Sequence, residues 1–78
     1  MKVKITKPDS TVFEGEAKQI HLPGAGGRFE MLENHAPIIS ALSQGTLRVV
    51  TPEGQEKLFD IRGGVIKGQQ NDILILVQ

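Results

Sequence analysis

The sequence predicts an all-β fold, an antiparallel β-sandwich or barrel. Apolar and polar residues alternate at a period of two along most of the chain, which is typical of half-buried strands. Gly and Pro interrupt this pattern at spacings of about 8–12 residues, and no segment carries a sustained helical stripe. The chain has 78 residues, so we expect a single domain over residues 1–78.

Five segments of the first half are expected to be short and extended. Val3 and Ile5 alternate with polar residues, Pro23 is expected to close the third segment, and the paired isoleucines of the fifth favour a strand over a helical turn. A glycine-rich connector, residues 24–27, follows the third segment, and its glycines are expected to supply a positive φ. The segments are residues 2–6, 11–13, 17–22, 29–32 and 38–42.

The second half is predicted to contain four more strands. Residues 46–51 and 55–62 are expected to pair antiparallel across a type I turn, because Thr51-Pro52-Glu53-Gly54 has Pro second and Gly fourth. Residues 65–67 follow a glycine pair that marks a kink. Residues 72–77 are apolar enough to be covered on both faces.

The composition argues against several classes of function. Nine basic and nine acidic residues are interspersed and cancel, and there is no Trp or Tyr, so we expect no nucleic-acid partner. There is no cysteine, which rules out disulfides and thiolate metal ligands. No apolar run approaches the ~20 residues of a transmembrane helix, so any membrane association is expected to come through a partner.

The glycine-rich connector and His35 are the two candidates for chemistry. A phosphate-binding loop needs Gly-Lys-Ser/Thr before a helix, whereas Gly27 is followed by Arg28 and a segment without helical period. His35 has no nucleophile nearby in the sequence, which favours a local hydrogen bond before Pro37 over contact with a partner. The carboxylates are interpreted as solvated charges, and little concave volume is expected, so we predict no catalytic residue, metal or cofactor.

An ordered set of short motifs resembles the epsilon subunit of F-type ATP synthases. The resemblance covers essentially the whole chain, and it is the order and spacing of the motifs that are specific. The motifs are Phe13-Glu14-Gly15-Glu16, Gly26-Gly27-Arg28-Phe29, Asn34-His35-Ala36-Pro37-Ile38, Gly45-Thr46-Leu47-Arg48-Val49, Gly63-Gly64-Val65 and Asn71-Asp72-Ile73-Leu74-Ile75.

This resemblance implies a flattened β-sandwich of about ten short strands in the rotor's central stalk. Such a domain performs no chemistry, links the gamma subunit to the membrane rotor ring of c subunits, and couples rotation to ATP synthesis by proton or sodium flow. It lies at the cytoplasmic face of the bacterial inner membrane as a peripheral part of the complex. The family commonly adds a C-terminal helical hairpin; the chain ends with its last strand, so we expect that hairpin to be absent, and no bound nucleotide.

The resemblance also implies two sets of contact residues. The expected contacts with gamma are Lys7, His35, Ala36, Pro37, Ile38 and Ile39. The expected contacts with the rotor ring are Gly26, Gly27, Arg28 and Phe29. The sequence departs from the family at Arg28, where an acidic residue is frequent, and at Gln44, where a proline is usual.

Four apolar residues are not clearly assigned to the interior by the alternation. We expect some of them to be exposed in the isolated domain and covered by gamma; they are Ile20, Ile38, Ile39 and Val50. Two alternatives remain open. One is a biotinyl or lipoyl carrier domain, for which Lys67 lacks the usual sequence context, and the other is a small binding barrel of the oligonucleotide-binding type.

Overall fold

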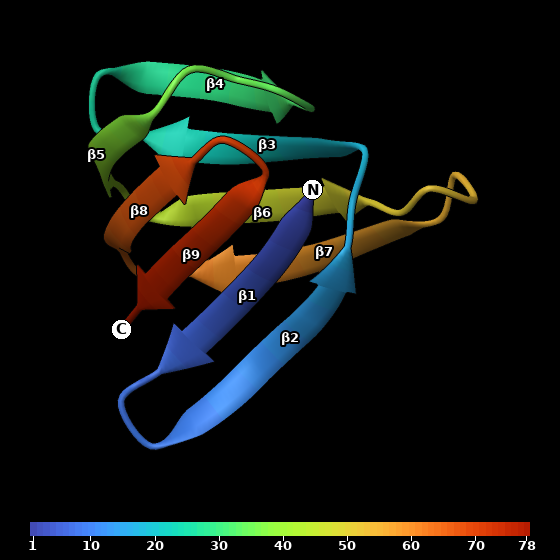
Figure 1. The fold of residues 1–78 in the computed structure, drawn as a ribbon. Helices are drawn as coiled ribbons and strands as arrows, with labels where there is room; N and C mark the ends of the chain where they lie inside the picture. The colour runs from blue at the N-terminus through green and yellow to red at the C-terminus, as the bar shows by residue number, and fades with distance from the viewer.

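The computed structural model describes all residues, 1–78, and is built entirely from strands and their connections (Figure 1). The all-β prediction is confirmed, with nine strands. They are β1 (Lys2–Lys7), β2 (Ser10–Glu16), β3 (Gln19–Gly24), β4 (Gly27–Leu32), β5 (Ile38–Leu42), β6 (Gly45–Val50), β7 (Glu56–Ile61), β8 (Gly64–Gln69) and β9 (Asp72–Val77). The structure has no helix of the length and hydropathy needed to cross a membrane.

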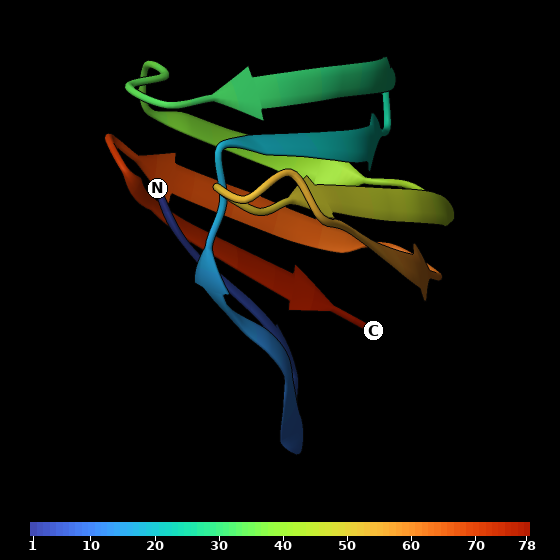
Figure 2. The same cartoon turned by 90° about the vertical axis from the view of Figure 1, so that its right-hand side faces the viewer.

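The strands form one strongly curled sheet whose two halves pack face to face as layers. The pairing order is β2-β1-β9-β8-β5-β3-β6-β7, with β4 paired to the other edge of β3. Figures 1 and 2 show β2, β1, β9 and β8 in one layer, crossing the layer of β4, β3, β6 and β7 at an angle. The two layers are joined where Gly24 of β3 pairs with Leu42 of β5.

One pairing departs from the antiparallel prediction. β1 runs parallel to β9, with Val3 opposite Ile73 and Ile5 opposite Ile75. All other pairs are antiparallel. Parallel neighbours cannot be joined by a hairpin, and here the rest of the chain forms the connection. The alternation within each segment does not show whether a strand far away in the sequence pairs with it in parallel or antiparallel.

The core lies between the layers and is almost wholly aliphatic. Fifteen buried apolar residues form one cluster, and the alternate residues of β1, β3, β6 and β9 contribute nine of them. At the outer edges of the order, Phe13 of β2 and Phe59 of β7 meet with ring centroids 5.7 Å apart. This tilted aromatic contact lies where the two layers approach a second time.

Several predicted boundaries shift in the structure. β3 does not end at Pro23: this buried residue lies within the strand, opposite Arg28. The pairing of β3 with β6 stops at His21, so a missing N–H at Pro23 removes no bond from that ladder. β8 likewise runs beyond residue 67 to Gln69.

Gly64 is required by a close backbone approach. A Cβ at this position would lie against the main chain of Leu76 on β9. Gly26 has no atom within 4 Å of an added Cβ, which makes it a matched control.

We predict that Gly64→Ala destabilises the domain by about 1–3 kcal/mol, because the backbone of a paired strand must shift to admit the methyl group. This corresponds to a fall of roughly 5–20 °C in Tm for a domain of this size. Gly26→Ala is expected to stay within about 0.5 kcal/mol of the parent. Thermal unfolding followed by circular dichroism measures both; equal Tm values for the two variants would contradict the packing at Gly64.

Candidate functional site

The outer face of the β5–β8–β9 layer carries a patch of exposed apolar side chains. Ile39 is 74% exposed, Leu76 49% and Val65 43%. The register places Ile39 in one row with Lys67 and Leu74, and the next row holds Ala41, Val65 and Leu76. We call this surface the outer apolar patch, which consists of Ile39, Ala41, Val65, Leu74 and Leu76.

The patch arises because β9 is apolar on both of its faces. Ile73, Ile75 and Val77 are buried in the core, while Leu76 is exposed and Leu74 is half-buried on the opposite face. The prediction that residues 72–77 are covered on both sides is therefore wrong for this domain alone. Aliphatic side chains left on one contiguous face indicate an interaction surface.

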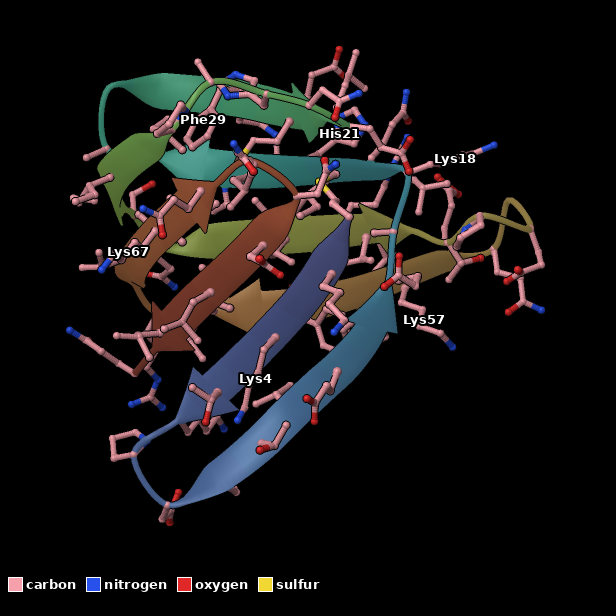
Figure 3. The ribbon with its side chains drawn as sticks, in the orientation of Figure 1. Lys4, Lys18, His21, Phe29, Lys57 and Lys67 are labelled. Atoms are coloured by element: carbon pink, nitrogen blue, oxygen red, sulfur yellow. The ribbon has the colours of Figure 1, made fainter.

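A groove lies beside the patch over β2, β1, β9 and β8. Its volume is about 460 Å³, so the expectation of little concave volume is also wrong. Lys4 and Lys67 border it and project from β1 and β8 (Figure 3). Three lysines and three carboxylates line the groove, so their formal charges cancel: Lys2, Lys4, Lys67, Glu14, Glu16 and Asp72. No group of three or more His, Asp or Glu side chains is arranged to hold a metal ion.

The structure divides the residues expected to contact gamma between two places. His35, Ala36 and Pro37 lie in the connection between β4 and β5, which leads directly to Ile39. Lys7 lies elsewhere, at the end of β1: the register aligns Ile38 with Val3, four residues before Lys7. The outer apolar patch lies between these two places and continues from Ile39.

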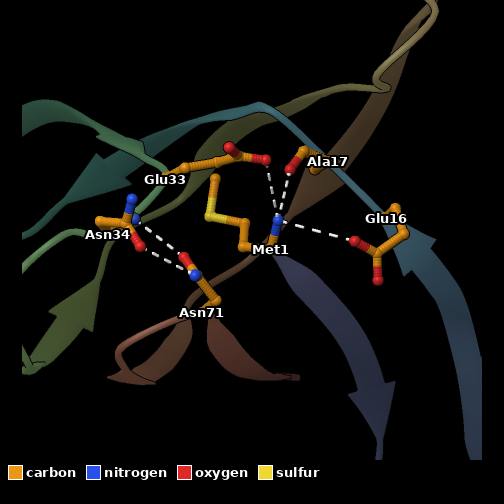
Figure 4. A network of polar contacts seen from close by, with 6 residues as sticks. All are labelled: Met1, Glu16, Ala17, Glu33, Asn34 and Asn71. Atoms are coloured by element: carbon orange, nitrogen blue, oxygen red, sulfur yellow. Dashed lines mark hydrogen bonds and ion pairs between the residues drawn. The ribbon is translucent and has the colours of Figure 1, made fainter.

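A polar network holds the β4–β5 connection in place (Figure 4). Asn34, at φ 63°, donates its backbone N–H to Asn71 Oδ1 at 2.8 Å, and Asn71 Nδ2 donates to Asn34 Oδ1 at 3.0 Å. Next to it, the Met1 ammonium group donates to Ala17 O at 2.9 Å and to Glu33 Oε1 at 3.3 Å. The connection is thus tied to the β8–β9 turn and to the start of β1.

His35 makes the local contact that its sequence context favours. Its Nδ1 lies 2.7 Å from Ala36 O, within hydrogen-bond distance. The ring is half-buried, and Ala36 and Pro37 are exposed beside it. Its partner, Ala36 O, is a backbone oxygen. The His35 ring has no hydrogen bond to a polar side chain, so it forms no acid–base or nucleophilic pair.

The residues expected to contact the rotor ring lie at the turn of the β3–β4 hairpin. Gly24 pairs with Gly27 across this turn, and Gly27 has a φ of 128°, which confirms the predicted role of glycine. Ala25 N donates to Ala41 O at 3.0 Å, anchoring the turn to β5. A strand follows Gly27, so the turn does not open a helix that could bind phosphate.

Arg28 and Phe29 differ in what they present. Arg28 is exposed, although its Nη1 donates to Thr46 O at 3.0 Å. Phe29 is half-buried and packs against the core. Gly26, Gly27 and Arg28 therefore form the surface of the turn, while Phe29 supports it from beneath.

Of the four apolar residues left unassigned by the alternation, only Ile39 is plainly exposed. Ile20 is fully buried in the core, Ile38 is half-buried against the core, and Val50 is buried outside the main core cluster. The expectation that some of the four are exposed holds. The sequence reading missed Val65, Leu74 and Leu76, although the apolar residues on both faces of β9 were the signal for them.

The whole chain, residues 1–78, matches the family model described as "ATP synthase, Delta/Epsilon chain, beta-sandwich domain". Curated relatives include the ATP synthase epsilon chains of Clostridium novyi and of Nostoc sp., each 36% identical. These matches cover 96% of this chain, and 57% and 56% of the two relatives respectively. The chain thus spans a little over half the length of these relatives.

Two solved structures share the fold. A chain of the Euglena gracilis mitochondrial ATP synthase (OSCP/F1/c-ring) superposes with a TM-score of 0.90 at 21% identity, over 96% of this chain and 48% of that one. A chain of the Tetrahymena thermophila mitochondrial ATP synthase (central stalk/c-ring) gives 0.78 at 17% identity, over 99% and 62%. With the fold, the motifs and the match over all 78 residues in agreement, the chain belongs to the family of ATP synthase delta/epsilon chain β-sandwich domains.

Proposed function

We propose that this domain is a non-catalytic part of the central stalk of an F-type ATP synthase, where it links the gamma subunit to the rotor ring. The main support for the proposal is the outer apolar patch. The patch begins at Ile39, next to the β4–β5 connection that contains His35. Ile39, at 74% exposure, is the centre of the expected gamma contact. Burying a Leu or Ile side chain contributes roughly 1.5–3 kcal/mol, so a patch of this kind supports a lasting interface.

The turn of the β3–β4 hairpin is proposed to meet the polar loops of the rotor ring. Gly26 and Gly27 let the backbone approach closely, and Arg28 adds a positive charge. The solved relatives described above are parts of assemblies that contain a c-ring, which supports this assignment. Because Arg28 stands where an acidic residue is frequent, the charge pairing with the ring that the family implies does not carry over to this position.

The contact residues that the resemblance implies fit this geometry unequally. His35, Ala36 and Pro37 lie beside Ile39 and join the gamma contact, whereas Lys7 reaches gamma only if the interface extends along β1. Ile38 packs against the core, so substitutions there test the fold as much as the interface. Phe29 contributes by supporting the turn above it.

The mechanism is mechanical and follows from stiffness. The domain adds no reacting group to the complex; a well-packed two-layer fold passes torque from gamma to the ring. Proton or sodium movement belongs to the ring, and the complex would lie at the cytoplasmic face of a bacterial inner membrane, as the bacterial relatives suggest. We propose no cofactor and no bound nucleotide.

The carrier-domain alternative finds no support in the position of Lys67. A modifiable lysine lies at a hairpin turn, whereas Lys67 lies within β8, opposite Ile39 on one side and Leu74 on the other.

We predict that Ile39→Asp weakens binding of the domain to its gamma subunit by roughly 30-fold or more, the effect of losing a hot spot of about 2 kcal/mol. Leu58→Asp is the matched control, because Leu58 is 64% exposed but lies on β7 in the other layer. Titration calorimetry with purified gamma measures both. Equal affinities for the two variants would remove the outer apolar patch from the interface.

We further predict that Arg28→Glu changes the affinity of the gamma-bound domain for the rotor ring. The change is expected to be at least about fivefold at low salt and smaller at high salt. Lys57→Glu, a charge reversal on exposed β7, is the control. Co-sedimentation with ring-containing vesicles provides the measurement. If the two reversals act alike, Arg28 is not at the ring contact.

A further inference from the structure

A chain of charged side chains crosses the outer face of the second layer, on the opposite side of the molecule from the outer apolar patch. The register places Glu30 of β4, His21 of β3 and Arg48 of β6 side by side in one row. Arg48 Nη1 continues the chain to Glu56 Oε1 of β7 at 3.0 Å. Figure 3 shows His21 on this layer.

His21 Nε2 has two neighbours that require opposite protonation states. It lies 3.4 Å from Arg48 Nη2 and 3.5 Å from Glu30 Oε2. A guanidinium group only donates, so its contact is favourable when Nε2 offers a lone pair. A carboxylate only accepts, so its contact is favourable when Nε2 carries a proton. One nitrogen cannot satisfy both neighbours at once.

The remaining charges around His21 do not remove this conflict. Arg28 precedes Glu30 by two positions on β4 and donates to Thr46 O. β5 pairs with β3 only at Gly24 and carries no charged residue. Lys18 lies before the start of β3 and extends away from the molecule (Figure 3).

The partners of Arg48 hold its guanidinium group in place beside His21. Its side chain is 39% exposed, Nη1 is held by Glu56, and Nε is buried without a hydrogen-bond partner. Nη2 is thus the atom through which Arg48 can link β6 to the imidazole of β3.

We propose that His21 is a proton-dependent switch between two cross-strand links. In the neutral state His21 carries its proton on Nδ1, and Nε2 accepts from Arg48, which links β3 to β6. When Nε2 takes a proton from solvent, it donates to Glu30 and is repelled by Arg48, so the link moves to β4. β4 pairs with no strand other than β3, so this link tightens an edge strand.

The tautomer of His21 tests the neutral state directly. Long-range ¹H–¹⁵N spectra of the imidazoles at about pH 8.5, well above the ordinary histidine range, are expected to show His21 mainly as the Nδ1–H form. Arg48→Met removes the donor at similar length and is expected to move His21 toward the Nε2–H form. His35, in the connection between β4 and β5, is the internal control and should not change. A mainly Nε2–H form in the parent, or an unchanged tautomer in Arg48→Met, would overturn the proposal.

Amide hydrogen exchange tests the protonated state. At about pH 5, where an ordinary histidine is charged and an ordinary glutamate is still ionised, Glu30→Gln is expected to speed exchange across β4 by about threefold or more. At about pH 8 the same substitution is expected to leave these rates within the error of measurement. Exchange in β1 and β9 is the control at both values. An equal effect of Glu30→Gln at both pH values, or none at either, would contradict a switch. Both experiments use the isolated domain and need neither gamma nor the ring.

Discussion

A two-layer domain can cover only one face of each of its strands. This constraint follows from the period of two, which sends alternate side chains to opposite faces of a sheet. In β8 and β9 the inward set, Ile66, Ile73 and Ile75, is buried in the shared core. The outward set includes Val65 and Leu76, which are exposed, and Leu74, which is half-buried. We propose that a surface from outside the domain covers these residues, and the proposed function depends on that cover.

The two outer faces meet the same constraint in different ways. On the β5–β8–β9 side, aliphatic residues lie in adjoining rows, with Lys67 between Ile39 and Leu74 and Lys4 on the other side of Leu74. On the β4–β3–β6–β7 side, charges pair with one another across strands from Glu30 to Glu56. Exposed ion pairs of this kind contribute little stability, but they remain well solvated without a partner. This second face also carries the exposed Leu32 and Leu58, but they lie on β4 and β7 with β3 and β6 between them, so they do not adjoin as the residues of the outer apolar patch do.

Local pattern was sufficient to predict most strands and the class of the fold. Alternation located β1, β6, β7 and β9 closely, and the glycine-rich stretch was correctly interpreted as a tight turn with positive φ at Gly27.

Pairing direction was not predictable in this way, because the parallel β1–β9 pair depends on the path of all the residues between them. The same limit explains Pro23, whose place inside β3 depends on where β6 stops pairing. The prediction that β9 is covered on both faces was wrong for a related reason. Apolar residues on both faces of a strand show that both faces are suited to burial, but they do not show that the same domain buries both. The separation of His35 from Lys7 among the expected gamma contacts could not be predicted either, because it depends on the register of four strands.

The most direct test of whether the outer apolar patch contacts gamma is to observe its side chains while gamma binds. Isoleucine, leucine and valine methyl groups of the domain can be followed by NMR during titration with purified gamma. We expect large shifts or broadening at Ile39, Val65, Leu74 and Leu76, while the methyl groups of Leu32 and Leu58, exposed on the other layer, stay unchanged. Changes confined to Leu32 and Leu58, with Ile39 and Leu76 unaffected, would contradict this expectation.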